Sequence, residues 1–489
     1  MATLSSALNY ALSGLSVTAA QSALVSRNVS FAGDENYTHK SAEIYTLPGG
    51  AAAISAPGRS MDRQLLAKFL GSASDASSRQ AVLDAVNQIA ATVGDPENED
   101  SVAALVGKLQ TSLSTYETNP SSETLAATAL ESARSVVSKL NASSAEVIGI
   151  RAEADKAIVQ SVDHINTLLA QFKVVNDSIV RGSGTATDLA ENLDQRDSIL
   201  KLLSEEIGIR TVSRNNNDLV IYADGGTVLF EGSPRSVTVT GTPVFDPVTA
   251  GQDIQIDGAL VSGPAAVMPV TTGKLAAFVK VRDEITVQMQ QQLDEAASGL
   301  IRNFAESDRS VPPALPDVAG VFVDSAGGLP TAGTVSTGLA SRLRLNPLAD
   351  PRVGGTPRMI RDGGFGGPSY VYNSAGSSGY QGRIAELIGT FDMAMDFDAV
   401  AGLGSRDSLK AFGRNSAAWV ESLRQSSQAA ADKSSATRVR TDETLLRVTG
   451  VNIDQEMATL LDLEKSYQAS SKIISVIGSM LDTLLESVR

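Results

Sequence analysis

The last forty residues, Gly450–Arg489, decide the fold, and they read GVNIDQEMATLLDLEKSYQASSKIISVIGSMLDTLLESVR. Steps of seven residues from Ile453 meet only apolar side chains, at Leu460, Tyr467, Ile474, Leu481 and Val488. Leu463, Ile477 and Leu484 fill three of the five d positions of the same heptad. A sustained seven-residue repeat predicts a helix that packs against another helix in a left-handed coiled coil.

The start of this helix is marked by local signals. Gly450 interrupts the preceding helical pattern, Asn452 is a good N-cap residue, and Gln455 follows three positions later, as in a capping box. No proline follows Gly450. We therefore expect one helix from about Ile453 to the end of the sequence.

A matching stripe lies at the other end of the chain. Its a and d positions hold Leu4, Leu8, Ala11, Leu15, Val25 and Val29. Each stripe is too narrow to be buried by its own helix, so one interpretation is an amphipathic hairpin formed by the two terminal segments. The alternative is that both are helices of an ordinary bundle.

Composition excludes several classes of function. The 489 residues carry a formal net charge of −15, which argues against nucleic acid and against an anionic membrane surface as partners. With no cysteine and two histidines, disulfides and thiolate metal sites are excluded and imidazole chemistry is nearly so. We find no catalytic motif, and we predict no enzyme activity, no cofactor and no metal.

Neither a secretory signal peptide nor a transmembrane run is recognisable. The first residues, Met-Ala-Thr-Leu-Ser-Ser, lack a basic segment followed by an apolar one. No apolar run approaches the length needed to cross a bilayer, and we expect no membrane insertion. Taken alone, these features indicate a cytoplasmic protein.

Between the ends, the pattern predicts a mainly α, elongated, multidomain protein with β insertions. Ser121–Arg181 contains no proline and one glycine, which predicts one very long helix or two in line. After Ile207 the apolar period changes from 3.6 to 2, which indicates a central β-rich region. The predicted segments are a coiled-coil segment 1–35, a helical rod domain 36–206, a β-rich domain 207–272, a long returning helix 273–307, a Gly/Pro-rich and β-rich insertion 308–380, the second part of the rod 381–449, and a coiled-coil segment 450–489.

Two patterns between the ends resemble sites. Asp194, Arg196 and Asp197 lie on one predicted helix and suggest either a paired-carboxylate site or a salt-bridged face beside a domain junction. We favour the second interpretation, because general acid–base work needs a partner with a displaced pKa. Gly363–Gly367 is glycine-rich, but it lacks the Lys-Ser/Thr of a phosphate loop and is expected to be a surface loop.

Several motifs carry a family resemblance. Gly450–Met457 (GVNIDQEM), Tyr467–Ser470 (YQAS) and Met480–Leu485 (MLDTLL) resemble the C-terminus of bacterial flagellar rod, hook and hook-associated proteins. Asn192–Asp197 (NLDQRD) and Gly226–Gly232 (GTVLFEG) are similar to the first of the two families of hook–filament junction proteins. The family's Asn-rich turn ending in Pro-Gly-Tyr appears as Asn28–Tyr37 without its proline. The resemblance covers roughly the first 305 and the last 100 residues, and the stretch between them is unmatched.

The resemblance implies a structural subunit of the bacterial flagellum that polymerises through its terminal helices and connects hook to filament. It implies self-association in a ring, contact with the hook protein and with the second junction protein, and an export chaperone on the C-terminal helix. It also implies an extracellular location, reached by type III export without a cleavable signal peptide, in place of the cytoplasm. The interface would comprise Leu4, Leu8, Leu15, Val25, Val29, Ile453, Leu460, Leu463, Tyr467, Ile474, Ile477, Leu481 and Leu484.

Other functions stay open at this point. The chain could be another axial protein, either the second junction protein or a divergent flagellin. It could also be an extracellular adhesin or hydrolase carried on a helical stalk, with its site in 308–380.

Overall fold

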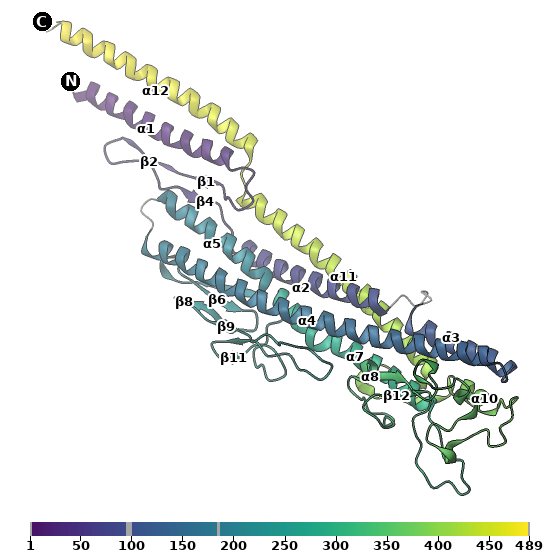
Figure 1. Ribbon diagram of the computed structural model, residues 1–489. Helices are drawn as coiled ribbons and strands as arrows, with labels where there is room; N and C mark the ends of the chain where they lie inside the picture. The colour runs from purple at the N-terminus through teal and green to yellow at the C-terminus, as the bar shows by residue number, and fades with distance from the viewer. Residues whose placement is uncertain (1, 94–99, 183–185, 488–489) are drawn as a thin grey trace.

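The computed structural model describes residues 2–93, 100–182 and 186–487. It is an elongated, mainly α molecule with small antiparallel sheets, which confirms the predicted fold class (Figure 1). Both termini lie at the same end, and the segment around 308–380 lies at the other. Most of the length between them is helical.

The helices are numbered in chain order. They are α1 (Ala2–Ser30), α2 (Arg63–Val93), α3 (Val102–Thr118), α4 (Glu123–Arg181), α5 (Ala186–Glu206), α6 (Lys274–Lys280), α7 (Thr286–Asn303), α8 (Leu339–Arg342), α9 (Met359–Asp362), α10 (Gly382–Thr390), α11 (Leu409–Thr449) and α12 (Ile453–Ser487). The terminal pair α1–α12 forms one end, and we call the remainder of the molecule the rod.

The backbone of the rod is α4, a single helix of 59 residues. Its first turn is capped by Ser122, whose side chain accepts a hydrogen bond from Leu125 N. At 1.5 Å per residue it spans about 90 Å. Its buried positions recur at three- and four-residue spacing from Ala126 to Ile179, so one apolar stripe organises both cores of the rod.

The half of the rod beside the terminal pair is built around what we call the proximal core. Leu66 and Phe69 of α2, Phe172 of α4 and Leu203 of α5 pack there against strands of the β-rich region. Phe172 and Phe230 meet edge to face, with ring centroids 4.8 Å apart. This region therefore belongs to the same compact unit as the helices that surround it.

The other half of the rod has a distal core, to which 308–380 contributes directly. Phe322, Leu339 and Leu343 are fully buried against residues of α4 and α7. The predicted β-rich insertion contains one two-stranded sheet, β12 (Phe322–Asp324) with β13 (Leu343–Leu345), and otherwise turns and short helices among its described residues. Proline and glycine break its strands, while its apolar residues still reach the core.

The β-rich region after α5 forms two sheets. The strands are β5 (Ile209–Ser213), β6 (Leu219–Ala223), β7 (Val228–Glu231), β8 (Ser233–Pro234), β9 (Val237–Thr238), β10 (Gln255–Ile256) and β11 (Ala259–Leu260). The first four pair in sequence order, and the last three form a separate sheet in the order β11-β10-β9. Pro234 ends the first sheet, since proline cannot continue the hydrogen-bond ladder.

The predicted returning helix differs from the one observed. The returning helix is α6 and α7 joined by a π-helical turn, Val281–Ile285, where the Thr286 hydroxyl donates to Val281 O at 2.8 Å. Helix α10 ends at Thr390, and β14 (Ala394–Asp396), which follows it, pairs with β15 (Arg406–Ser408). The remaining strands are β1 (Lys40–Ser41), β2 (Ile44–Thr46), β3 (Ala52–Ile54) and β4 (Gly58–Arg59).

Candidate functional site: the terminal helix pair and its joint

The terminal helices lie side by side and run in opposite directions (Figure 1). Ala11, Val17 and Val25 of α1 and Ile477 of α12 are buried. The hairpin of the two ends is therefore present within one chain. It buries one narrow seam, because two helices alone can cover only one face of each other.

The predicted interface residues fall into three groups. Val25 and Ile477 are buried; Leu4, Leu8, Leu15, Val29, Leu460, Leu463, Ile474 and Leu481 are half-buried; Ile453 and Tyr467 are exposed. The structure describes neither the side chain of Leu484 nor residue Val488. Within one chain, Val25 and Ile477 are thus covered, while Ile453 and Tyr467 of the heptad are exposed.

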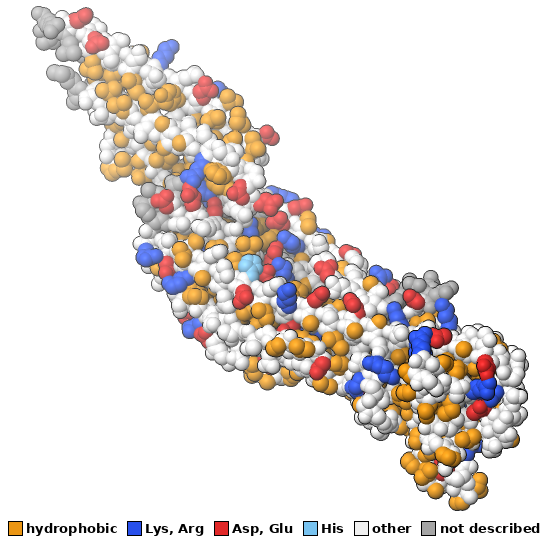
Figure 2. All heavy atoms as spheres, viewed as in Figure 1, with side chains coloured by type: hydrophobic (Ala, Val, Ile, Leu, Met, Phe, Trp, Pro, Cys, Tyr) orange, Lys and Arg blue, Asp and Glu red, His pale blue; other side chains and the backbone are white. Residues whose placement is uncertain are grey.

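A second apolar surface is left open on the pair. On α12, Ile453, Met457, Leu461, Tyr467, Ile473, Val476 and Met480 are exposed, and on α1 Tyr10 and Leu12 are exposed. Figure 2 shows hydrophobic side chains gathered over this end of the molecule. Arg27 is the one charged residue in α1. A helix that faces water normally carries a charged face, so α1 has the composition of a helix that is covered.

The break between α11 and α12 has the predicted cap. Gln455 N donates to the Asn452 side chain at 3.2 Å, and Gly450 N donates to Leu446 O at 2.7 Å. α12 thus begins as a new helix, which sets its direction apart from that of α11.

Behind the seam, a buried carboxylate holds both terminal helices to the extended segment that follows α1. Glu456 of α12 accepts a hydrogen bond from Asn28 Nδ2 at 3.1 Å and lies 2.9 Å from His39 Nε2. His39 N also donates to Thr449 O at 2.6 Å, at the end of α11. The Tyr37 hydroxyl donates to Asn28 Oδ1 at 2.9 Å, and burial raises the pKa of Tyr37 to about 12.

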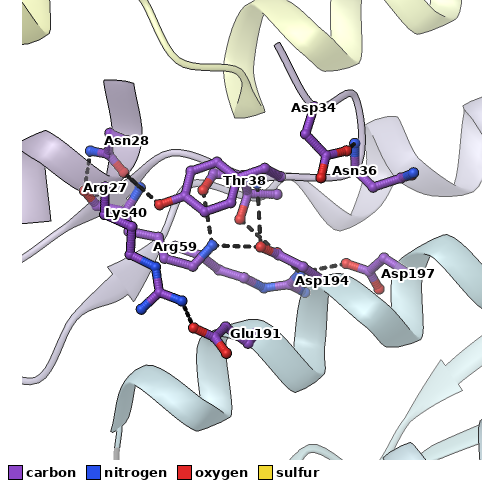
Figure 3. A network of polar contacts seen from close by, with 11 residues as sticks. Arg27, Asn28, Asp34, Asn36, Thr38, Lys40, Arg59, Glu191, Asp194 and Asp197 are labelled. Carbon is purple, nitrogen blue, oxygen red and sulfur yellow. Dashed lines mark hydrogen bonds and ion pairs between the residues drawn. The ribbon is translucent and has the colours of Figure 1, made fainter. Parts of the chain in front are cut away.

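Helix α5 carries the predicted acidic cluster, and the structure places it at this joint (Figure 3). Asp194 accepts hydrogen bonds from Lys40 Nζ at 2.5 Å and from the Thr38 hydroxyl at 2.7 Å. Arg59 bridges the two carboxylates, 3.1 Å from Asp194 and 2.6 Å from Asp197. Burial lowers the pKa of Lys40 and raises that of Asp197. The cluster is a salt-bridged face at a domain junction, as favoured from the sequence.

Arg196 points to the other side of α5. Its Nη1 donates to Asn176 Oδ1 at 3.1 Å and to Asn217 O at 2.5 Å, and burial lowers its pKa to about 10. Arg196 therefore ties α5 to α4 and to the first β turn. It does not complete a site with Asp194 and Asp197.

The other candidate site from the sequence, Gly363–Gly367, is a turn whose backbone is hydrogen-bonded to a buried carboxylate. Glu306 is buried and accepts hydrogen bonds from Gly364 N at 3.1 Å and Phe365 N at 2.8 Å. A buried carboxylate beneath the loop disfavours a phosphate. Among the described residues, no group of His, Asp and Glu has the arrangement of a metal site, and no helix is long and apolar enough to cross a membrane.

Sequence reasoning missed most of the residues that surround Asp194 and Glu456. Thr38, His39 and Lys40 lie in a segment that reads as a polar, extended connection. One signal was present, because Glu456 and Ser470 are the two d positions that the apolar heptad leaves unfilled. A carboxylate on a seam needs a buried partner, and the sequence does not say which residue supplies it.

Comparisons with known proteins agree with this architecture. The family model of the flagellar hook-associated protein FlgK helical domain matches residues 86–310, and that of the flagellar basal body rod FlgEFG protein C-terminal matches residues 445–487. Flagellar hook-associated protein 1 of Salmonella typhimurium and that of Salmonella typhi are each 25% identical over 318 residues. That alignment covers 60% of this chain and 55% of each relative, so the chain spans about half the length of the curated relatives it matches.

Among solved structures, the flagellar hook junction protein FlgK from Burkholderia pseudomallei matches with a TM-score of 0.43 and 22% identity. The match covers 53% of this chain and 46% of that one. The helical-domain match spans most of the rod up to α7, and the C-terminal match spans the end of α11 and α12. By the two family models and the curated relatives, the chain is similar to flagellar hook-associated FlgK proteins over residues 86–310 and to the C-terminal segment of flagellar rod proteins over residues 445–487.

Proposed function

We propose that this protein is a structural, non-catalytic subunit of the bacterial flagellum that joins hook to filament. The observation that carries the proposal is the coincidence of two features in α12. Its sequence matches the C-terminal family model of axial rod proteins, and it exposes several large apolar side chains after pairing with α1. Apolar surface of this kind marks a protein–protein interface.

In this proposal, the open apolar surface contacts the terminal helix pairs of further copies of the chain, which are arranged in a ring. A surface that is not self-complementary gives head-to-tail contacts, and these close into rings or continue as helices. The hook protein would lie on one side of the ring and the second junction protein on the other. Before assembly, an export chaperone would cover the apolar face of α12, and the subunit would leave the cell through the flagellar type III export apparatus.

A deletion strain tests the role directly. Electron microscopy should show hooks without filaments, and flagellin should accumulate in the medium. Expression of the intact chain should restore filaments on the hooks. Filaments of normal number on the deletion strain would contradict the proposal.

A further inference from the structure

The terminal pair is attached to the rod by polar contacts, without a shared apolar core. Among the described side chains, neither the proximal nor the distal core includes a residue of α1 or α12. The chain crosses between the two bodies twice, from β4 into α2 and from α11 into α12. The side-chain contacts at the joint therefore determine how the pair is oriented.

One face of α5 makes most of those contacts. Glu191, Asp194, Asp197 and Lys201 are spaced by three, three and four residues, which places them on one helix face. Glu191 pairs with Arg27 of α1, and Lys201 Nζ donates to Glu35 O at 3.3 Å. With Asp194 and Asp197 on Lys40 and Arg59, the row holds the extended segment along its length (Figure 3).

A second set of contacts connects the segment that α5 holds to the two terminal helices. Lys40 N donates to Asn28 Oδ1 at 3.2 Å, and Asn28 Nδ2 reaches Glu456 of α12. The segment that α5 holds is therefore bonded to both terminal helices. A rotation of the pair about the two chain crossings would have to break the contacts of one set or the other.

The chemistry of the joint favours one geometry over a range of geometries. The Lys40 side chain is fully buried and that of Asp194 is 10% exposed, so separating them would leave a buried charge without its partner. Charge-assisted hydrogen bonds are directional, whereas apolar surfaces can slide past one another. A buried ion pair contributes little net stability compared with an apolar pair, so its value here lies in orientation.

We propose that this α5 face is a clasp that fixes the angle of the terminal pair on the rod. When the clasp is removed, the two chain crossings become a hinge. The inference concerns the isolated subunit and does not depend on the proposed function.

The test measures distances between pairs of spin labels by pulsed electron resonance. The chain has no cysteine, so labels can be placed on cysteines introduced at exposed sites. Ala458 at the joint end of α12 and Gln171 on α4 report the angle between the two bodies. Ala152 and Gln171, both on α4 and about 28 Å apart along the helix axis, report the integrity of the rod. The clasp variant is Lys40→Met with Asp194→Leu, which removes both buried charges together.

The unaltered clasp should give one narrow distance distribution between α12 and α4, and the double variant a distribution several-fold wider. The matched control, Lys173→Met, breaks an exposed ion pair on α4 and should leave the distribution unchanged. The pair within α4 should be the same in all three proteins. A broad distribution with the clasp intact, or a narrow and unshifted one in the double variant, would overturn the proposal.

A milder variant provides the test if the double variant disturbs the fold of the rod. Arg59→Gln removes the bridge between Asp194 and Asp197 and retains Lys40. It should widen the α12–α4 distribution by less than the double variant does. An unchanged distribution in Arg59→Gln, after loss of the rod distance in the double variant, would also overturn the proposal.

Discussion

The chain contains two antiparallel helix pairs, α1 with α12 and α2 with α11, each joining an early segment to a late one. In the second pair, α2 is backed by α5, α6 and α4, and Leu66, Leu83 and Val86 are buried. In the first pair, no third helix among the described residues covers α1 and α12. Among the described side chains of α12, Ile477 is the one apolar side chain that is buried. The same topology thus gives a folded core in one place and an open surface in the other. The difference shows that an apolar stripe becomes a core only when a third element covers it.

The largest effect on the isolated subunit should come from the distal core. Phe322 is fully buried and meets Phe304 edge to face, with centroids 4.8 Å apart. Phe322→Ala should lower the free energy of unfolding by about 3–5 kcal/mol. Chemical denaturation followed by circular dichroism measures the loss. Val353→Ala, in the same segment but 66% exposed, should change it by less than about 0.5 kcal/mol. Equal effects of the two would mean that 308–380 is separable from the rod.

A smaller and pH-dependent effect should come from a carboxylate buried in α7. Asp294 accepts hydrogen bonds from Gly338 N at 2.8 Å and Ala340 N at 2.9 Å, and burial raises its pKa to about 6. A folded-state pKa above the unfolded one means that this group stabilises the fold most below about pH 4. That contribution, up to about 3 kcal/mol, is lost as the pH rises through about 6.

The variant Asp294→Asn isolates this contribution, because asparagine does not titrate. Unfolding free energies of both proteins should be compared across this pH range. The difference in unfolding free energy between the two proteins should shrink as the pH rises. The Asp294→Asn variant should be the less stable protein at every pH, because asparagine accepts fewer hydrogen bonds. A difference that grows with pH would show that the carboxylate is stabilised in its charged form.

The sequence predicted the helical elements well because their signals are local. The stripe of α4, the cap at Asn452 and the heptad of α12 each depend on residues a few positions apart. The partition of the β strands into two sheets, and the contribution of 308–380 to the distal core, depend on contacts between distant segments. No periodic pattern records such contacts.

The candidate site divides in the same way. The seam positions could be predicted, because a heptad states which residues share a face. The orientation of the pair could not, because it depends on Lys40, His39 and Thr38 meeting Asp194 and Glu456 across long stretches of chain. The sequence of an extended segment does not indicate which residue will pair with a single charged side chain in it.

The seam of the terminal pair is tested at Ile474, which is half-buried there. In the isolated subunit, Ile474→Ala should cost about 1 kcal/mol within the pair, and the unfolding of the rod should be unchanged. In an assembly that packs this site fully, the same change should cost about 2–5 kcal/mol per subunit. Ile474→Asp must also bury an unpaired carboxylate there, so cells should export the protein and build no filament.

Export and incorporation need separate measurements, because a chaperone would use the same face of α12. The amount of secreted subunit, the number of filaments and the swimming speed should be recorded for each variant. Ile474→Asp cells that secrete the protein and swim normally would show that this seam is not packed in the assembly.

The smallest effect is expected at Glu464, on the same helix but off the seam. Its side chain is exposed and accepts a hydrogen bond from Gln468 Nε2 at 3.2 Å, one turn along α12. Such a surface bond contributes little, so Glu464→Ala should change the stability of the pair by less than about 0.5 kcal/mol. If the open surface of α12 binds its partner through apolar contacts and without charge pairing, cells with the variant should also form filaments and swim as the parent strain does. Loss of filaments in Glu464→Ala, with secretion intact, would show that α12 makes a charged contact in the assembly.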